Sequence, residues 1–209
     1  METDNSQVYQ FKVTLNGIRP PIWRRIQVPA EYTFWDLHVA IQDAMGWFDS
    51  HLHDFKITNL STGHYEKFGI PIEDDIDFGE EPPTKPGWEH YIADYFSLEN
   101  SKAIYEYDFG DGWEHTVLLE KIISRDEKKI YPICLDGKRA CPPEDCGGVW
   151  GYENLLEIIA DPNHEDYDTW IEWLGEDFDP EFFDAKLVEF DDPTERWKFA
   201  FEESDELLH

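Results

Sequence analysis

The chain has 209 residues and a formal net charge of −30, from 47 acidic and 17 basic side chains. Proteins bind nucleic-acid phosphates through lysine and arginine, so this imbalance opposes direct nucleic-acid binding. Nine Trp, ten Tyr and fourteen Phe indicate a globular chain rather than a disordered one. No apolar run approaches the roughly 20 residues that cross a bilayer, which excludes a membrane-spanning helix.

The first residues and the cysteines indicate the compartment. Residues 1–6 lack the basic patch and apolar segment of a secretory signal. The chain has three cysteines, and without an export signal free thiols or a metal site are favoured over disulfides. We therefore expect a cytoplasmic protein.

The negative charge is concentrated near the C-terminus. Residues 161–209 hold 18 acidic and three basic side chains, which is half of the net charge. Acidic blocks of this kind are commonly solvated surfaces or tails. The second interpretation is a docking surface for a basic protein partner, and the sequence leaves both open.

The N-terminal part predicts two strands, a helix and a third strand. Residues 8–15 alternate apolar and polar side chains as a half-buried strand does, and 22–28 predicts a second strand after a turn. Thr33 and Asp36 have the spacing of a capping box, and the apolar positions that follow predict a helix ended by a glycine. A third strand is expected over 51–58. This β-β-α-β order is grasp-like, with a half-sheet packed on one helix.

The middle of the chain predicts a loop and a hairpin. Residues 73–88 predict an acidic, proline-rich loop, and 91–98 are ambiguous, with a short helix as one interpretation. Strands at 104–109 and 113–122 form a hairpin, because Gly110-Asp111-Gly112 supplies the positive φ angles of a tight turn.

The remaining elements complete a single α+β domain. They are a strand at 130–135 and helices at 152–159 and 170–174. We expect a mixed or antiparallel sheet that carries the N-terminal helix, with further helices at the C-terminus. The expected boundaries are a disordered N-terminus at 1–7, the domain at 8–190 and an acidic C-terminal tail at 191–209.

Strand alternation turns histidines toward the inner face of the predicted sheet. His51 and His53 share a face with the apolar residues of their strand, and His115 does so in its own strand. A buried imidazole needs a hydrogen-bond partner. Each histidine is therefore either a core residue bonded to a carbonyl or tyrosine, or part of a polar site shared with Asp108 and Asp111.

Two cysteines lie in a loop stiffened by two prolines and followed by two glycines. This loop can bring the sulfurs of Cys141 and Cys146 to one point, and His53 and His115 would complete a tetrahedral zinc site. The alternative is a rigid turn with incidental thiols, because cysteines of a zinc knuckle are usually two residues apart. Cys134 lies in an apolar strand and is expected in the core. No other cofactor is indicated.

The same residues suggest a hydrolase. His115 would act as the base, Asp108 or Asp111 would orient it, and a metal or Cys141 would supply the electrophile or nucleophile. Carboxylates beside glycines are also ordinary turn formers, because Asp bonds its own backbone there. No recognised catalytic motif joins these residues, so both interpretations stay open.

Four peptides stand in the order in which they occur in one known family. They are IRPPIWRR at 18–25, HLHDF at 51–55, YDFGDGWEH at 107–115 and CPPEDCGG at 141–148. From about residue 8 to about residue 190 the chain resembles the plasmid pRi third-open-reading-frame-like family of bacteria and archaea. The resemblance implies a compact α+β domain without an established activity. Some members are described as resolvase-like passenger proteins of insertion elements.

The residues together favour a cytoplasmic, non-catalytic binding or adaptor module. Its pocket of His, Asp and Cys side chains would lie between the His53 strand, the 107–115 hairpin and the Cys141–Cys146 loop. A metal-dependent hydrolase at the same place is the alternative. A DNA-recombination accessory is a second alternative, which rests on the resemblance alone.

Overall fold

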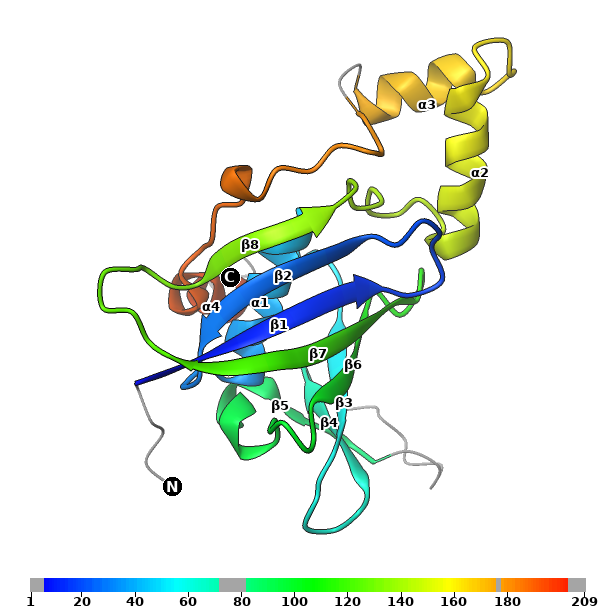
Figure 1. Ribbon diagram of the computed structural model, residues 1–209. Helices are drawn as coiled ribbons and strands as arrows, with labels where there is room; N and C mark the ends of the chain where they lie inside the picture. The colour runs from blue at the N-terminus through cyan, green and yellow to red at the C-terminus, as the bar shows by residue number, and fades with distance from the viewer. Residues whose placement is uncertain (1–5, 72–81, 176–177, 203–209) are drawn as a thin grey trace.

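The computed structural model describes residues 6–71, 82–175 and 178–202. These residues form an eight-stranded sheet in the order β5-β4-β3-β6-β7-β1-β2-β8. Neighbouring strands are antiparallel except β4 and β5, which are parallel, so the sheet is mixed. The predicted single α+β domain is confirmed (Figure 1).

The elements are as follows. The strands are β1 Gln7–Leu15, β2 Trp23–Pro29, β3 His53–Thr58, β4 Tyr65–Gly69, β5 Thr84–Pro86, β6 Lys102–Tyr107, β7 Trp113–Ser124 and β8 Ile133–Lys138. The α-helices are α1 Phe34–Met45, α2 Gly148–Ala160, α3 Tyr167–Leu174 and α4 Pro193–Phe201. Three short 3-10 helices are η1 Gly87–Glu89, η2 Ile92–Asp94 and η3 Ala185–Leu187.

Local sequence determines both ends of α1. The Thr33 hydroxyl accepts the Asp36 N–H, and the Asp36 carboxylate accepts the Thr33 N–H, which is the predicted capping box. Gly46 ends the helix in the left-handed conformation, with φ of 93°, that a residue with a Cβ adopts only at a cost. The chain order β1, β2, α1, β3 is the predicted β-β-α-β start, so the grasp-like start is confirmed.

Helix α1 crosses one face of the sheet and fills the core. It links β2 to β3, and β6, β7 and β1 lie between these two strands in the sheet. Ten of its twelve residues are buried, because the sheet packs against one side and α4 and η1 cover part of the other. Phe34 stacks on Phe68 and contacts Phe55 at a centroid distance of 5.3 Å, so the helix contacts β4 and β3 directly.

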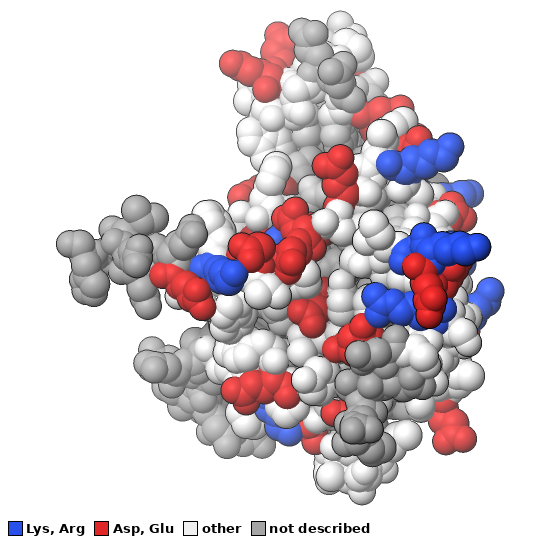
Figure 2. All heavy atoms as spheres, turned by 90° about the vertical axis from the view of Figure 1, so that its left-hand side faces the viewer, with Lys and Arg blue, Asp and Glu red and all other residues white. Residues whose placement is uncertain are grey.

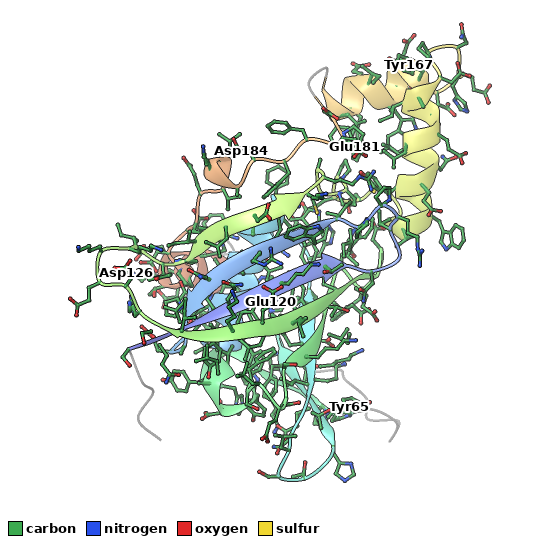
Figure 3. The ribbon with its side chains drawn as sticks, in the orientation of Figure 1. Tyr65, Glu120, Asp126, Tyr167, Glu181 and Asp184 are labelled. Carbon is green, nitrogen blue, oxygen red and sulfur yellow. The ribbon has the colours of Figure 1, made fainter. Side chains whose placement is uncertain are left out.

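The other face of the sheet is polar. Arg25 on β2 donates hydrogen bonds of 2.7 and 2.9 Å to the Glu120 carboxylate on β7. Figure 3 shows Glu120 on this outer face, turned away from α1. The alternation predicted for β1 follows from this division, with one face toward α1 and one toward solvent.

Several predicted boundaries differ from the structure. Strand β3 begins at His53, so His51 lies before the strand and does not share its face. The expected strand at 130–135 is displaced to β8, and the ambiguous segment 91–98 contains η2. The disordered N-terminus expected at 1–7 gives way to β1 from Gln7. Residues 1–5 and most of the predicted acidic loop, 72–81, lie outside the described residues.

The acidic C-terminal tail predicted at 191–209 is wrong for its described part. Residues 193–201 form α4, which begins with the Asp192 carboxylate accepting the Thr194 N–H. Trp197 of this helix packs edge-on against Trp35 of α1, and Arg196 forms an ion pair with Asp43 of α1. The domain therefore extends to at least residue 202, because apolar and charged contacts bind this segment to α1.

Helices α2 and α3 project from one end of the sheet, and the chain then returns along β8 (Figure 1). Figure 3 shows Glu181 and Asp184 on this returning segment. The Ala140 N–H donates to the Pro180 carbonyl at 3.1 Å, and the Phe183 ring lies 3.8 Å from the Arg24 guanidinium carbon. Within the described part of the chain, no helix has the length and apolar character needed to cross a membrane.

Candidate functional site

Two groups of side chains gather potential metal ligands within the described residues. His38, Asp49 and His53 form one group, and His51, Asp108 and Asp145 form the other. In each group one ligand atom per residue lies within 4.8 Å of the others. Neither group contains a cysteine.

The zinc set predicted from the sequence is not brought together. His53 and His115 are both buried on the inner face, as predicted, but β6 lies between their strands. His53 pairs in register with Tyr107, whereas His115 pairs with Tyr105. In the described chain, Cys141 and Cys146 join no group of three ligands with either histidine. The expected His/Asp/Cys pocket is therefore divided into separate sites.

The His38–Asp49–His53 group is built around a chain of hydrogen bonds. The His38 Nδ1 lies 2.8 Å from the Tyr105 hydroxyl, and its Nε2 lies 2.7 Å from Asp49 Oδ1. Gln42 Nε2 donates to the Tyr105 oxygen at 2.8 Å, which leaves the hydroxyl proton for His38 Nδ1. A neutral His38 then carries its proton on Nε2 and donates it to Asp49. The tyrosine fixes the orientation of the imidazole.

His53 completes this group. Its ring stacks on the His38 ring with centroids 3.4 Å apart and planes 6° apart. Only 1% of His53 is exposed, and its Nδ1 has no hydrogen-bond partner. Burial, with the neighbouring His38 as a smaller cause, lowers the pKa of His53 well below its usual value. His53 is therefore neutral at physiological pH and keeps a nitrogen lone pair.

Asp49 connects the buried histidines to the surface. Its residue has a φ of 59°, and its side chain is 13% exposed. The second carboxylate oxygen lies 3.7 Å from Arg196 of α4, which also contacts Asp43 at 2.6 Å and pairs with Asp191. Asp43 is 7% exposed, and its burial raises its pKa even though Arg196 opposes that effect.

Asp49 also lines a cavity of about 840 Å³, which we call the α4 cavity. Its walls are Trp47, Phe48, Asp49, Asp191, Asp192, Glu195, Arg196, Phe199 and Ala200. This set contains four acidic residues and one basic residue. Phe48 and Phe199 are 85% and 73% exposed, so two aromatic rings are presented to solvent beside the acidic groups.

The second group forms where three of the four peptides named in the sequence analysis meet, those at 51–55, 107–115 and 141–148. His51 Nε2 lies 3.2 Å from Asp145 and 3.7 Å from Asp108, without the alignment of a hydrogen bond. Asp108 Oδ1 accepts the N–H groups of Gly110 and Asp111, so this candidate catalytic residue forms the hairpin turn. Asp145 is 72% exposed. Solvent therefore screens the pairing of its carboxylate with His51.

The remaining candidates hold the cysteine loop to the strands. Asp111 accepts the Gly147 N–H at 3.1 Å, and Trp47 donates to the Pro142 carbonyl at 2.9 Å. Glu144 accepts the Tyr107 hydroxyl and, at 3.2 Å, the Phe48 N–H. These bonds connect three separate segments. The loop is thereby bonded to the end of the sheet.

Burial also sets the chemistry of the thiols and of His115. Desolvation raises the pKa of Cys141 above its usual range and that of Cys146 to about 12, so both are neutral thiols at physiological pH. Cys134 is buried, as predicted. His115 donates from Nδ1 to the Tyr105 carbonyl at 3.3 Å, and burial lowers its pKa to about 4. With no exposure, His115 cannot reach a substrate as a general base.

Sequence reasoning missed His38 and Asp49. A helical wheel contains a signal for His38, because it follows Phe34 by four residues and precedes Ile41 by three, on the buried stripe of α1. Asp49 follows the helix-ending glycine by three residues and gives no periodic signal. Its place beside His38 depends on the loop that joins α1 to β3.

Comparisons with known proteins identify relatives of the whole domain. The chain is 51% identical to MM3350 from Methanosarcina mazei Go1, whose crystal structure is titled as a protein of unknown function. That match covers 90% of this chain and 100% of the other, with a TM-score of 0.81. The uncharacterized protein y4hQ of Sinorhizobium fredii is 35% identical over 173 residues, which is 81% of this chain and 82% of y4hQ.

A family model also matches most of the chain and includes the four peptides named in the sequence analysis. The model of the plasmid pRiA4b ORF-3-like protein family matches residues 7–187, from the start of β1 to the end of η3. The matched range includes every residue of both ligand groups and the cysteine loop. The chain belongs to the plasmid pRiA4b ORF-3-like protein family.

Proposed function

We propose that the protein is a cytoplasmic, non-catalytic binding module that holds a basic segment of a partner protein in the α4 cavity. The observation that carries this proposal is the composition of the cavity wall. Asp49, Asp191, Asp192 and Glu195 line it together with one basic residue, Arg196, and the volume of this open cavity is about 840 Å³. A lysine or arginine side chain is the complementary ligand.

The exposed aromatic rings support the same ligand. Phe48 and Phe199 stand at the cavity wall with most of their surface in solvent. A lysine or arginine can place its charge over such a ring and its apolar stem along it, which is worth about 0.5–1 kcal/mol at an exposed site. An acidic pocket with aromatic walls therefore binds a basic peptide more tightly than charge alone would.

The charge of the whole molecule favours encounter with such a partner. Figure 2 shows acidic side chains across the middle of one face, with basic side chains gathered mainly toward one edge. With a net charge of −30, the protein attracts cationic partners at long range and increases their rate of association. Salt would weaken this attraction.

The test uses a fluorescently labelled peptide of alternating arginine and glycine, with a glutamate-for-arginine peptide as its control. Binding is followed by fluorescence anisotropy at physiological salt. We expect the basic peptide alone to bind, and Phe48→Ala with Phe199→Ala to weaken binding about tenfold or more. Trp150→Ala is the matched control, because Trp150 is 81% exposed and lies on α2, outside the cavity wall.

Two results would contradict the proposal. If the Phe48→Ala/Phe199→Ala variant binds as the unchanged protein does, the cavity is not the binding site. If Trp150→Ala weakens binding equally, the attraction is a general property of the acidic surface.

Metal-dependent hydrolysis is the second candidate, and one observation favours it. Asp49 lines the same cavity and bonds to the buried His38 behind it, so a metal held by this pair would lie beside the space open to a substrate. The DNA-recombination alternative gains no support from this cavity, because four carboxylates repel phosphate.

A further inference from the structure

We propose that His38, Asp49 and His53 form a binding site for one divalent transition-metal ion. Three different parts of the fold supply the ligands: α1, the loop after it, and the first residue of β3. The site goes beyond the binding module proposed above and does not depend on a basic ligand.

The distances within the group are short enough for one ion, and one of the two stacked imidazole rings would have to tilt so that both in-plane lone pairs converge on it. One ligand atom from each residue lies within 4.8 Å of the other two. Ligand atoms at about 2.0–2.2 Å from a zinc-like ion lie roughly 3–4 Å from one another. His38 Nε2 and Asp49 Oδ1 already approach to 2.7 Å, where the imidazole proton lies between them. A metal ion on Nε2 would require the other tautomer of His38, in which the proton is on Nδ1 and is donated to the Tyr105 oxygen, and Nε2 and Oδ1 would separate slightly.

The neighbours of His38 fix its orientation, as the residues around a metal site do for a ligating histidine. Tyr105 is fully buried and contacts the ring nitrogen of His38 that faces away from Asp49. Gln42, also fully buried, fixes the tyrosine. Outer-shell partners of this kind set the orientation and basicity of a ligating imidazole.

His53 supplies the observation that points to a bound metal ion. It is almost completely buried, and its Nδ1 has no hydrogen-bond partner. A buried polar atom without a partner is destabilising. A core histidine that served only for packing would be better replaced by phenylalanine, whereas a metal ligand must keep its lone pair.

The local charge also fits a dication. Asp43 and Asp49 are both largely buried, and they share one guanidinium, Arg196. The two carboxylates exceed the guanidinium by one negative charge. A metal ion would compensate that charge. Asp49 opens on the α4 cavity, which provides an entry route and space for further ligands.

The ligand types select the class of metal. Two imidazole nitrogens and one carboxylate suit zinc, iron(II) or cobalt(II). Magnesium and calcium prefer an all-oxygen shell, which this group does not provide.

The test titrates Co²⁺ into the full-length, chelator-treated protein and follows calorimetric heat and visible d–d absorption. We expect one equivalent to bind, Zn²⁺ to displace it, and Mg²⁺ in excess to leave it bound. Two variants remove a ligand. His53→Phe keeps an aromatic ring to stack on His38, and Asp49→Asn changes a partly exposed loop residue. Each should weaken Co²⁺ binding about a hundredfold or more.

Two matched controls address the other candidate sites. His51→Asn removes the histidine of the second group, and Cys141→Ser with Cys146→Ser removes the thiols. Both should bind Co²⁺ as the unchanged protein does. Circular dichroism checks that every variant is folded. Ring-nitrogen NMR of the unchanged protein with Zn²⁺ supplies a readout that needs no variant, because two histidines should shift.

The site is overturned if no stoichiometric Co²⁺ binding occurs. It is also overturned if the folded His53→Phe and Asp49→Asn variants bind unchanged, or if the His51 or cysteine variants are the ones that lose binding. Measuring the basic peptide in the presence of chelator keeps this outcome separate from that of the proposed function.

Discussion

The Trp35 indole donates a 3.0 Å hydrogen bond to the carbonyl oxygen of Pro193, and this bond joins α1 to the first turn of α4. The same indole ring lies 6.1 Å from the ring of His53 and packs edge-on against Trp197. One tryptophan therefore connects the C-terminal helix to the buried histidines. Helix α4 forms a wall of the α4 cavity and also stabilises the residues behind it.

Replacing Trp197 by Ala is expected to lower the free energy of unfolding by about 2 kcal/mol, because it removes a ring packed among aromatic residues. Those neighbours are Trp35, Trp88 and Phe201. Urea unfolding measures the change. Phe199→Ala on the same helix is the control and should alter stability by less than about 0.5 kcal/mol, since its ring is 73% exposed. Equal effects would show that α4 is not docked through Trp197.

Replacing Arg196 by Met should lower the free energy of unfolding by about 2 kcal/mol, because it leaves the buried Asp43 carboxylate without its cation. The double variant Arg196→Met/Asp43→Asn removes that charge and should recover at least half of the loss. Thermal unfolding of both variants measures this. Strictly additive losses in the double variant would mean that the two side chains do not interact.

His115 makes stability depend on pH. Burial lowers its pKa to about 4 in the folded protein, against 6.5 in the unfolded chain. Between these values the unfolded chain binds the proton and the folded protein does not, so stability falls as pH decreases from about 6.5 toward 4. The loss from this one group is on the order of 3 kcal/mol.

Comparison with a His115→Phe variant isolates this contribution from that of the many carboxylates. Urea midpoints measured at several pH values should fall less steeply with acid in the variant than in the unchanged protein. Parallel curves for the two proteins would contradict the assignment.

Gly148 is expected to resist replacement. Its φ is 67°, and a Cβ there would clash with the backbone carbonyl oxygen of Asp111. The side-chain carboxylate of Asp111 bonds the cysteine loop to the hairpin, so the clash would disturb this connection. Gly148→Ala should cost about 3 kcal/mol of unfolding free energy. Gly63 has a similar φ of 72° with nothing within 4 Å, so Gly63→Ala should cost only about 1 kcal/mol. Thermal denaturation of both variants tests this, and equal costs would show that the contact with Asp111 does not matter.

Elements whose signals are local could be predicted from the sequence. The α1 capping box is fixed by residues three apart, and the alternation of β1 follows from one buried and one solvent-facing side. The β6–β7 hairpin was also predicted, although the positive φ angles fall at Asp108 and Gly112 rather than throughout the glycine-rich turn. These features need no knowledge of distant residues.

Elements that depend on distant partners were missed. Strand β4 carries Tyr65, Glu66 and Lys67, a polar sequence that becomes a strand because β3 pairs with it. Helix α4 has a weakly apolar composition, and it is stabilised by Trp35 and Asp43, more than 140 residues earlier in the chain. Tertiary contacts outweigh local propensity in both cases.

The predicted grouping of His53 with His115 differs from the structure for another reason. The sequence correctly placed His53 and His115 on the inner face, but it could not give the strand order. Because β6 enters between β3 and β7, Tyr105 of β6 lies between the two imidazoles and keeps them apart. His53 meets His38, and His115 meets Trp47 at a centroid distance of 5.3 Å. Strand order is set by the whole chain, so alternation within single strands cannot reveal it.

The segment that returns from α3 has a consequence for the behaviour of the protein in concentrated solution. Strand β8 ends the sheet, and an uncovered outermost strand offers free backbone groups to another molecule of the same kind. Here η3 and Phe183 pack beside it, and Pro180 bonds to Ala140 just beyond its end, so the returning segment stands in the way of such an approach. Deleting this segment would therefore be expected to promote self-association through β8, visible as larger particles in light scattering.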